Sequence, residues 1–202
     1  MPSDRLTRRA LVGLFAVWLT VVGLGLGALW RYAQTPGPAA HAPQTWPANS
    51  RIARDATRPT LVMFTHPKCA CSRATISELA VLMAHVQRKV AVRVLFYHPS
   101  KAESGWDHTD LWESAAAIPG VTVSRDEDGV EAARFGSEAS GQALLYDAGG
   151  RLLFSGGITS ARGHSGDNTG RSELTTLLLN GASEPLATTP VYGCTIRELS
   201  TP

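Results

Sequence analysis

The sequence lacks several features that mark common classes of protein. Its 202 residues include only three cysteines, and its 19 basic and 17 acidic side chains nearly cancel, leaving a formal net charge of +2. Three cysteines cannot all pair within one chain and are too few for a disulfide-stabilised scaffold. Four arginines and one acidic residue lie within residues 1–50, so residues 51–202, with 15 basic and 16 acidic side chains, are nearly neutral. A basic surface of the kind that binds nucleic acid is therefore not expected.

What is present is the composition of a chain that folds. Hydrophobic residues make up 44% of the sequence and charged residues 18%, which is too apolar for a disordered chain. The length allows one domain with an appendage.

The appendage is an uncharged stretch near the N-terminus, residues 10–30. About 20 helical residues cross the hydrocarbon core of a bilayer. Three arginines precede the stretch and one follows it, so the positive-inside rule places residues 1–9 in the cytoplasm and the rest of the chain outside. We interpret residues 10–30 as one transmembrane anchor. A cleaved signal peptide is the alternative, and the apolar run is longer than the usual signal core.

The remaining chain divides into three parts by composition. Residues 31–54 are rich in proline and alanine and predict an extended, hydrated linker. Residues 55–182 predict a folded domain, and residues 183–202 a non-helical tail that carries Cys194.

Short apolar runs and helical periodicities alternate along the predicted domain. Strands are expected at residues 60–64, 90–97 and 121–123, helices at 72–89, 107–118, 126–135 and 172–180, and a β-hairpin at 143–146 and 152–154. A βαβ unit requires parallel strands, whereas the hairpin is antiparallel. The fold class is therefore α/β, with a mixed central sheet and helices on both faces.

The chemistry is concentrated where the first strand gives way to the first helix, at Cys69 and Cys71. A thiol at a helix start faces unpaired N–H groups and the positive end of the helix dipole, which favour the thiolate. Cys69 is therefore expected to have a lowered pKa, with contributions from His66, Lys68 and Arg73. The alternative is that both cysteines are buried and inert.

These residues resemble the thioredoxin superfamily, and within it the membrane-tethered TlpA/ResA-like proteins. The resemblance is carried by a strand ending at Phe64, a cysteine five residues later that opens a helix, and the hairpin LLYDAGGRLLFSGG. The Cys-x-Cys-Ser-Arg run and the late Gly-Cys are similar to the RedB-type subgroup. Over about residues 55–182, the resemblance implies a thioredoxin-like fold and a periplasmic domain at the bacterial inner membrane.

The sequence departs from the family pattern at two positions. Ser72 stands where the family has its second cysteine, and Ser140-Gly141 stands where it has a cis-proline that contacts the substrate. Ordinary disulfide exchange is thus in doubt, and Ser140 and Gly141 are candidate binding residues.

Two distant segments are candidates to complete the site. Cys194 could fold back to resolve a disulfide on Cys69, a role for which Cys71 competes; otherwise it is a free thiol on a loose tail. The loop at residues 156–168 is expected beside Cys69, since both follow strands that end at one sheet edge. Arg162 could hold an anion there, and His164 could move a proton or bind metal; a solvated turn is the alternative.

Three functions follow from these residues. The first is a thiol-disulfide oxidoreductase without a cofactor, in which Cys69 attacks and the partner is an extracytoplasmic thiol or disulfide protein. The alternative is a copper(I) metallochaperone, in which two thiolates and His164 hold the ion. A peroxidase ranks last, because His66 stands where peroxiredoxins have the threonine three residues before the cysteine.

Overall fold

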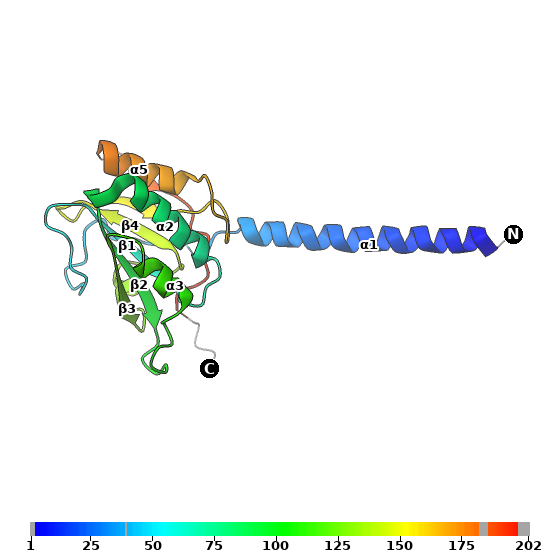
Figure 1. The fold of residues 1–202 in the computed structure, drawn as a ribbon, viewed down its shortest axis with the longest axis horizontal. Coiled ribbons are helices and arrows are strands. Elements are labelled where there is room, and N and C mark those ends of the chain that lie inside the picture. The colour runs from blue at the N-terminus through cyan, green and yellow to red at the C-terminus, as the bar shows by residue number, and fades with distance from the viewer. Residues whose placement is uncertain (1–2, 39, 182–185, 198–202) are drawn as a thin grey trace. The chain divides into compact units, whose positions relative to one another are not determined.

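The structure, a computed structural model, describes residues 3–38, 40–181 and 186–197. The chain separates into two units, the second of which begins at Pro36. The first unit is α1 (Ser3–Gln34), a single helix of 32 residues (Figure 1). Its part Thr7–Gln34 has a mean hydropathy of 2.2, so by length and composition it could cross a membrane. The predicted span at residues 10–30 lies within it.

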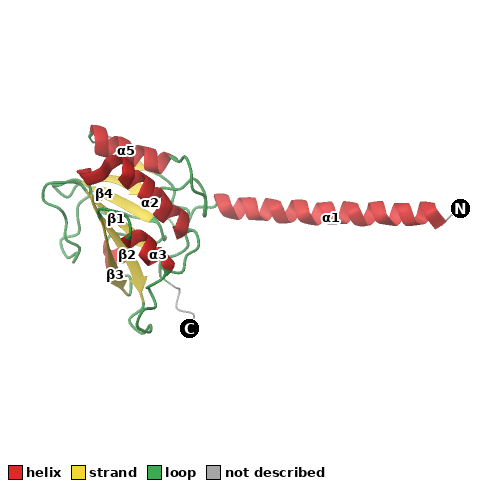
Figure 2. Ribbon diagram, viewed as in Figure 1, coloured by secondary structure: helices red, strands yellow, loops and turns green. Residues whose placement is uncertain are grey.

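The second unit is built on a six-stranded sheet with the strand order β3-β2-β1-β4-β5-β6. Figure 2 shows β3, β2, β1 and β4 side by side in this order. The strands are β1 (Thr60–Thr65), β2 (Ala91–His98), β3 (Val121–Glu127), β4 (Gln142–Tyr146), β5 (Leu152–Gly156) and β6 (Ala187–Thr188). β2 is parallel to both β1 and β3, whereas β4 is antiparallel to β1 and β5. β5 therefore runs parallel to β1, and the loops that follow these two strands leave from the same edge of the sheet.

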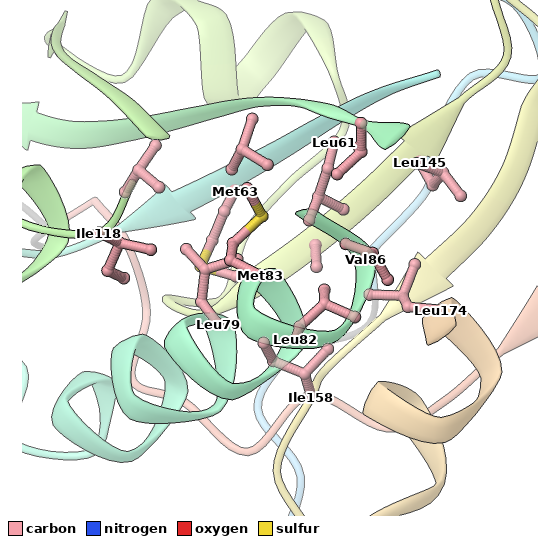
Figure 3. Packing of buried hydrophobic residues seen from close by; sticks show 14 of the residues in the cluster. Leu61, Met63, Leu79, Leu82, Met83, Val86, Ile118, Leu145, Ile158 and Leu174 are labelled. Carbon is pink, nitrogen blue, oxygen red and sulfur yellow. The ribbon is translucent and has the colours of Figure 1, made fainter. Parts of the chain in front are cut away.

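Helices cover both faces of this sheet. They are α2 (Ser72–Val86), a 3-10 turn (Gln87–Lys89), α3 (Asp110–Ala116), α4 (Val130–Arg134) and α5 (Thr169–Asn180). α2, α3 and α5 share one apolar cluster with the sheet, in which Leu174 of α5 lies beside Val86 of α2 and Leu145 of β4 (Figure 3). α4 and Phe64 belong to a second cluster on the opposite face. The predicted α/β fold class, a mixed central sheet with helices on both faces, is confirmed.

The largest difference from the predicted elements lies at the end of β3. Residues 126–135 are expected to be helical, but β3 extends to Glu127 and α4 occupies only Val130–Arg134. Pairing with β2 extends β3, since the register continues to His98 opposite Glu127. The carboxylate of Asp126 then accepts hydrogen bonds from the N–H groups of residues 131 and 132, both at 2.8 Å, which ends the strand and caps the helix.

The proline- and alanine-rich segment is not the extended, hydrated linker that its composition predicts. From Pro36 on it belongs to the folded unit. The Trp46 ring lies edge-on to the rings of Phe135 and Tyr146, with centroids 5.0 and 5.3 Å apart. The buried Tyr146 hydroxyl donates a 3.0 Å hydrogen bond to the carbonyl oxygen of Pro43. These aromatic contacts hold the segment against the domain.

The tail also packs on the domain. Residues 187–188 add the strand β6 beside β5, and Ile196 is only 1% exposed within the second apolar cluster. Over residues 186–197, Cys194 is therefore part of the folded structure and not a thiol on a loose tail.

Candidate functional site

Cys69 lies in the turn that joins β1 to α2. Its N–H donates to the carbonyl oxygen of His66 at 3.1 Å, and its own carbonyl oxygen accepts from the N–H of Ser72 at 3.0 Å. The helix begins at Ser72, so the thiol sits one turn ahead of the helix rather than at its first residue as expected. Cys69 is 4% exposed, because the core fixes both flanking elements and holds the turn between them.

Three sulfur atoms gather at this turn. The Sγ atoms of Cys69, Cys71 and Cys194 all lie within 4.8 Å of one another, and no disulfide joins them. The tail brings the third thiol: the N–H of Ser140 donates to the carbonyl oxygen of Cys194 at 2.7 Å. The structure thus brings together the three cysteines that the sequence singled out.

The three thiols have different tendencies to ionise. Burial raises the pKa of Cys69, but the hydrogen bonds from Ser72 and Cys194 together outweigh burial. The pKa of Cys69 is therefore lowered to about 7. Burial, followed by the hydrogen bond and charge of Cys69, raises the pKa of Cys194 to about 12. Burial and the charge of Cys69 also raise the pKa of Cys71, which Arg162 partly offsets. The cluster therefore favours one thiolate, on Cys69, beside two protonated thiols.

A chain of hydrogen bonds leads to the Cys69 sulfur. The N–H of His66 donates to Oγ of Ser140 at 2.8 Å, and the hydroxyls of Ser140 and Ser72 are 2.7 Å apart. Because Ser140 already accepts from His66, its own proton can point to Ser72, which leaves the Ser72 proton for the Cys69 sulfur. The Ser72 hydroxyl thus stabilises the thiolate.

The backbone around Ser140 requires small residues. Gly141 has φ +90° and its N–H donates to the carbonyl oxygen of Phe64 at 2.7 Å. A Cβ at Gly141 would lie 2.9 Å from Oγ1 of Thr75, and a Cβ at Gly193 would lie 1.7 Å from the carbonyl oxygen of Ser140. Main chain therefore packs directly on main chain where the tail crosses residues 139–141.

The side chains of the basic residues that lie near Cys69 in the sequence contact residues outside the cysteine cluster. Nζ of Lys68 lies 4.3 Å from the ring centroid of Trp106. Arg73 pairs with Asp110 on the surface, where both side chains are more than half exposed. The ring of His66 packs edge-on to Trp106. None of these three side chains is among the principal causes of the lowered pKa of Cys69, so the expectation that they help to lower it is corrected: hydrogen bonds do so instead.

The loop after β5 supplies a cation to the cluster but no further ligand. Arg162 donates a 2.8 Å hydrogen bond to the carbonyl oxygen of Gly193 and lowers the pKa of Cys71. His164 is exposed and, within the described part of the chain, is not in the group formed with the three cysteines. The expectation that His164 completes a metal site is therefore wrong; Cys194 is the third potential ligand.

Sequence reasoning missed the residue that anchors this loop. Glu78 of α2 is 2% exposed and accepts hydrogen bonds from the N–H of Gly166 at 2.7 Å and from the amide of Asn168 at 3.1 Å. Arg171 forms an ion pair with the same carboxylate. The available signal was an acidic residue between Ile76 and Leu79 on the apolar side of a helix, where an unpaired charge is costly.

Comparisons with known proteins support the fold. No family model matches the chain, and no curated protein matches it. A hypothetical protein from Sinorhizobium meliloti is 19% identical, with a TM-score of 0.63 over 83% of this chain and 100% of that one. An uncharacterized conserved protein from Geobacillus kaustophilus is 16% identical, with a TM-score of 0.59 over 84% and 95%. A secreted Mycobacterium tuberculosis disulfide oxidoreductase is 18% identical, with a TM-score of 0.43 over 61% and 81%.

Proposed function

We propose that this protein is a thiol-disulfide oxidoreductase in which Cys69 is the nucleophile and Cys194 the resolving thiol. The observation that carries the proposal is the cluster of three sulfurs within 4.8 Å, in which hydrogen bonding overcomes burial and lowers the pKa of Cys69 to about 7. A thiolate is the attacking species in disulfide exchange, and an attacking thiol works best when its pKa is near the ambient pH.

The exchange proceeds in two displacement steps. The Cys69 thiolate attacks one sulfur of a partner disulfide, which forms a mixed disulfide and releases the other partner sulfur as a thiolate. Cys194 gives its proton to that leaving thiolate and attacks the Cys69 sulfur, which releases the second partner sulfur as a thiolate that takes its proton from water. One partner disulfide and two protein thiols thus become two partner thiols and a Cys69–Cys194 disulfide, a two-electron exchange that also runs in reverse.

Cys194 suits the resolving role better than Cys71 does. A Cys69–Cys71 bridge would close a very small ring between residues two apart, and such a bridge is strained. Cys194 comes from a separate segment and already forms a side-chain hydrogen bond with Cys69. Arg162, which donates to the carbonyl oxygen of Gly193, supports the Cys194 main chain next to the reacting sulfurs.

The experiment that tests the proposal is a redox titration of the full chain in detergent micelles, with mass-spectrometric mapping of the cysteines. We expect one reversible two-electron couple and a Cys69–Cys194 disulfide in the oxidised form. Cys194→Ser should lose the couple and retain a mixed disulfide on Cys69, whereas Cys71→Ser should keep the couple. Absence of any reversible couple contradicts the function, and a Cys69–Cys71 bridge contradicts the assignment of the resolving thiol.

The cellular setting is part of the proposal. The helix Thr7–Gln34 has the length and composition of a membrane span, and the arginines that precede it favour a cytoplasmic N-terminus. We place the domain on the periplasmic side of a bacterial inner membrane, as a TlpA/ResA-like protein of the RedB type acting on an extracytoplasmic thiol or disulfide protein. Alkylation by a membrane-impermeant maleimide in spheroplasts tests this: Cys71 should react before the membrane is lysed. Labelling only after lysis contradicts the orientation.

Copper(I) binding is the second candidate, and the same three sulfurs favour it. Thiolates are soft ligands that select Cu(I), and Cys69, Cys71 and Cys194 present three sulfur atoms within 4.8 Å. The two protonated thiols would release their protons on binding the ion. The full chain kept reduced should then bind one Cu(I) in competition with a chelator, and Cys194→Ser should weaken that binding. Failure to bind stoichiometric copper eliminates this candidate and leaves the redox proposal standing.

A further inference from the structure

The reduced site is closed to a protein partner. Cys69 is 4% exposed, yet a displacement requires the attacking sulfur to reach bonding distance from a partner sulfur. A neighbouring segment must therefore move before exchange can begin. β1 and α2, which flank Cys69, are embedded in the core: Phe64 and Ser72 are each 1% exposed.

The tail is the neighbouring segment that a segment of another protein could replace. Residues 193–196 lie across residues 138–140 in an isolated antiparallel β-bridge, with Ala139 opposite Thr195. Two main-chain hydrogen bonds hold it, from the N–H of Ser140 to Cys194 at 2.7 Å and from the N–H of Ile196 to Glu138 at 2.8 Å. An extended segment of another protein can form the same bonds, because they involve no side chain.

The position before the cysteine adds a size requirement. A Cβ at Gly193 would lie 1.7 Å from the carbonyl oxygen of Ser140, closer than two non-bonded atoms can approach. Arg162 also donates to the Gly193 carbonyl oxygen at 2.8 Å. A segment bound in this way therefore needs glycine immediately before the residue that places its sulfur against Cys69.

We infer that residues 193–196 are an intramolecular occupant of the main-chain edge at residues 138–140, that a partner segment displaces them, and that this partner presents glycine directly before the reacting cysteine. This inference rests on the proposed function, since it describes the partner of the same site. The tail leaves when such a segment binds, and returns when Cys194 resolves the mixed disulfide.

The test uses the full chain in micelles with Cys69 as its sole cysteine (Cys71→Ser with Cys194→Ser). Gly193→Ala on this background should displace the tail through its clash with Ser140. Thr195→Ala is the matched control, because the Thr195 side chain is exposed in the same segment. The probe is a synthetic peptide of residues 190–197 whose thiol carries thionitrobenzoate. Attack by the Cys69 thiolate on the peptide sulfur forms a Cys69–peptide disulfide and releases the coloured thionitrobenzoate thiolate.

We expect Gly193→Ala to accelerate this release by about tenfold or more, and Thr195→Ala to leave it unchanged, at about pH 9.5, where the thiolate population limits neither protein. On the Gly193→Ala protein, a peptide with alanine in place of its glycine should react about tenfold more slowly, which corresponds to about 1.4 kcal/mol. Equal rates for the two peptides, or no acceleration, overturn the inference.

A second variant covers a failure of Gly193→Ala to fold, which a thermal melt detects. Ile196→Ala removes the 1%-exposed side chain that anchors the tail and adds no bulk, so it should accelerate the same reaction. The wild-type redox titration separates the two proposals. If the protein discriminates between the two peptides but shows no Cys69–Cys194 couple, the inference about the edge is retained and the oxidoreductase proposal is rejected. If it shows the couple but does not discriminate between the peptides, the oxidoreductase proposal is retained and the inference is rejected.

Discussion

The turn that carries Cys69 and the tail that carries Cys194 supply the same chemical group in opposite ways. The turn is short and lies between two buried elements, β1 and α2, so its position follows from its neighbours in the chain. The tail is placed by contacts with distant residues, through the N–H of Ser140 and the guanidinium of Arg162. The comparison teaches that a reactive sulfur can be positioned by local sequence while its partner depends on the whole fold.

The pKa values of the two thiols also differ, because that of Cys69 is lowered and that of Cys194 is raised. Burial opposes ionisation at both sulfurs, but Cys69 also accepts hydrogen bonds from Ser72 and Cys194, whereas Cys194 donates its proton to Cys69 and faces its charge. The direction in which the hydrogen bonds run therefore determines which sulfur is the thiolate. Five predictions test this comparison of the turn and the tail and of the segments that support them, from the largest expected effect to the smallest.

Replacement of the thiolate should have the largest effect. Cys69→Ser should slow the reduction of an activated aromatic disulfide by about a thousandfold or more, because the nucleophile is lost. Cys71→Ser should change that rate by less than about threefold. Absorbance of the released thiolate measures both rates. An equal loss in Cys71→Ser would contradict the assignment of Cys69 as the nucleophile.

The second largest effect is expected at Glu78, which anchors the loop that carries Arg162. Glu78→Ala removes the buried carboxylate that pairs with Arg171, and breaking such a pair costs about 3 kcal/mol of the free energy of unfolding. Asp167→Ala is the control, because Asp167 also pairs with Arg171 but is fully exposed, and should cost less than about 0.5 kcal/mol. Urea unfolding measures both values. Similar losses in the two variants would show that the buried carboxylate is not what stabilises this loop.

The turn beside the tail permits a comparison of two glycines with the same backbone angle. Gly141 and Gly181 both have φ +90°, but a Cβ at Gly141 meets Oγ1 of Thr75 at 2.9 Å and one at Gly181 meets nothing within 4 Å. Both alanine variants incur the backbone strain of about 1 kcal/mol. Gly141→Ala should lose about 1 kcal/mol more because of crowding, measured by thermal unfolding. Equal losses of stability in Gly141→Ala and Gly181→Ala would show that the turn at Gly141 can shift to accommodate the added Cβ.

The pH dependence should be the smallest effect. The pKa of Cys69 is about 7 in the folded chain, against an ordinary value of 9.0, so the folded state holds fewer protons between these values. The free energy of unfolding of the reduced protein should therefore gain a contribution as the pH rises from 7 to 9, and lose it as the pH falls through 7. The difference between wild type and Cys69→Ser, measured in urea across this range, isolates the contribution.

A substitution of Ser72 tests the cause of the same pKa shift. Ser72→Ala removes a hydrogen bond to the thiolate, so the pKa of Cys69 should move upward toward that of an ordinary cysteine. Ser77→Ala is the control, because its hydroxyl bonds only the carbonyl oxygen of Arg73 on the exposed side of the helix, at 3.0 Å. The pH profile of iodoacetamide labelling at Cys69 reports the shift. An unchanged profile in Ser72→Ala would show that the Ser72 hydroxyl does not lower the pKa of Cys69.

Most of the fold could be predicted, because its elements follow local rules. The buried run at residues 60–64, the helical periodicity that begins at Ser72, and the Asp/Gly turn of the hairpin each correspond to an element of the structure. The errors occur where tertiary contacts override composition. Pairing with β2 extends β3 into a predicted helix, and the rings of Phe135 and Tyr146 bind a segment that looked like a linker.

The sequence by itself determined that a cysteine stands between a buried strand and a helix, and that an uncharged stretch precedes the domain, since both are properties of neighbouring residues. Only the tertiary structure decided that Cys194 completes the cluster, that Arg162 and not Lys68 or Arg73 serves it, and that Glu78 anchors the loop. These contacts join residues far apart in the chain. No local pattern encodes them, because they depend on how the sheet order and the packed tail bring distant main-chain groups within hydrogen-bonding distance.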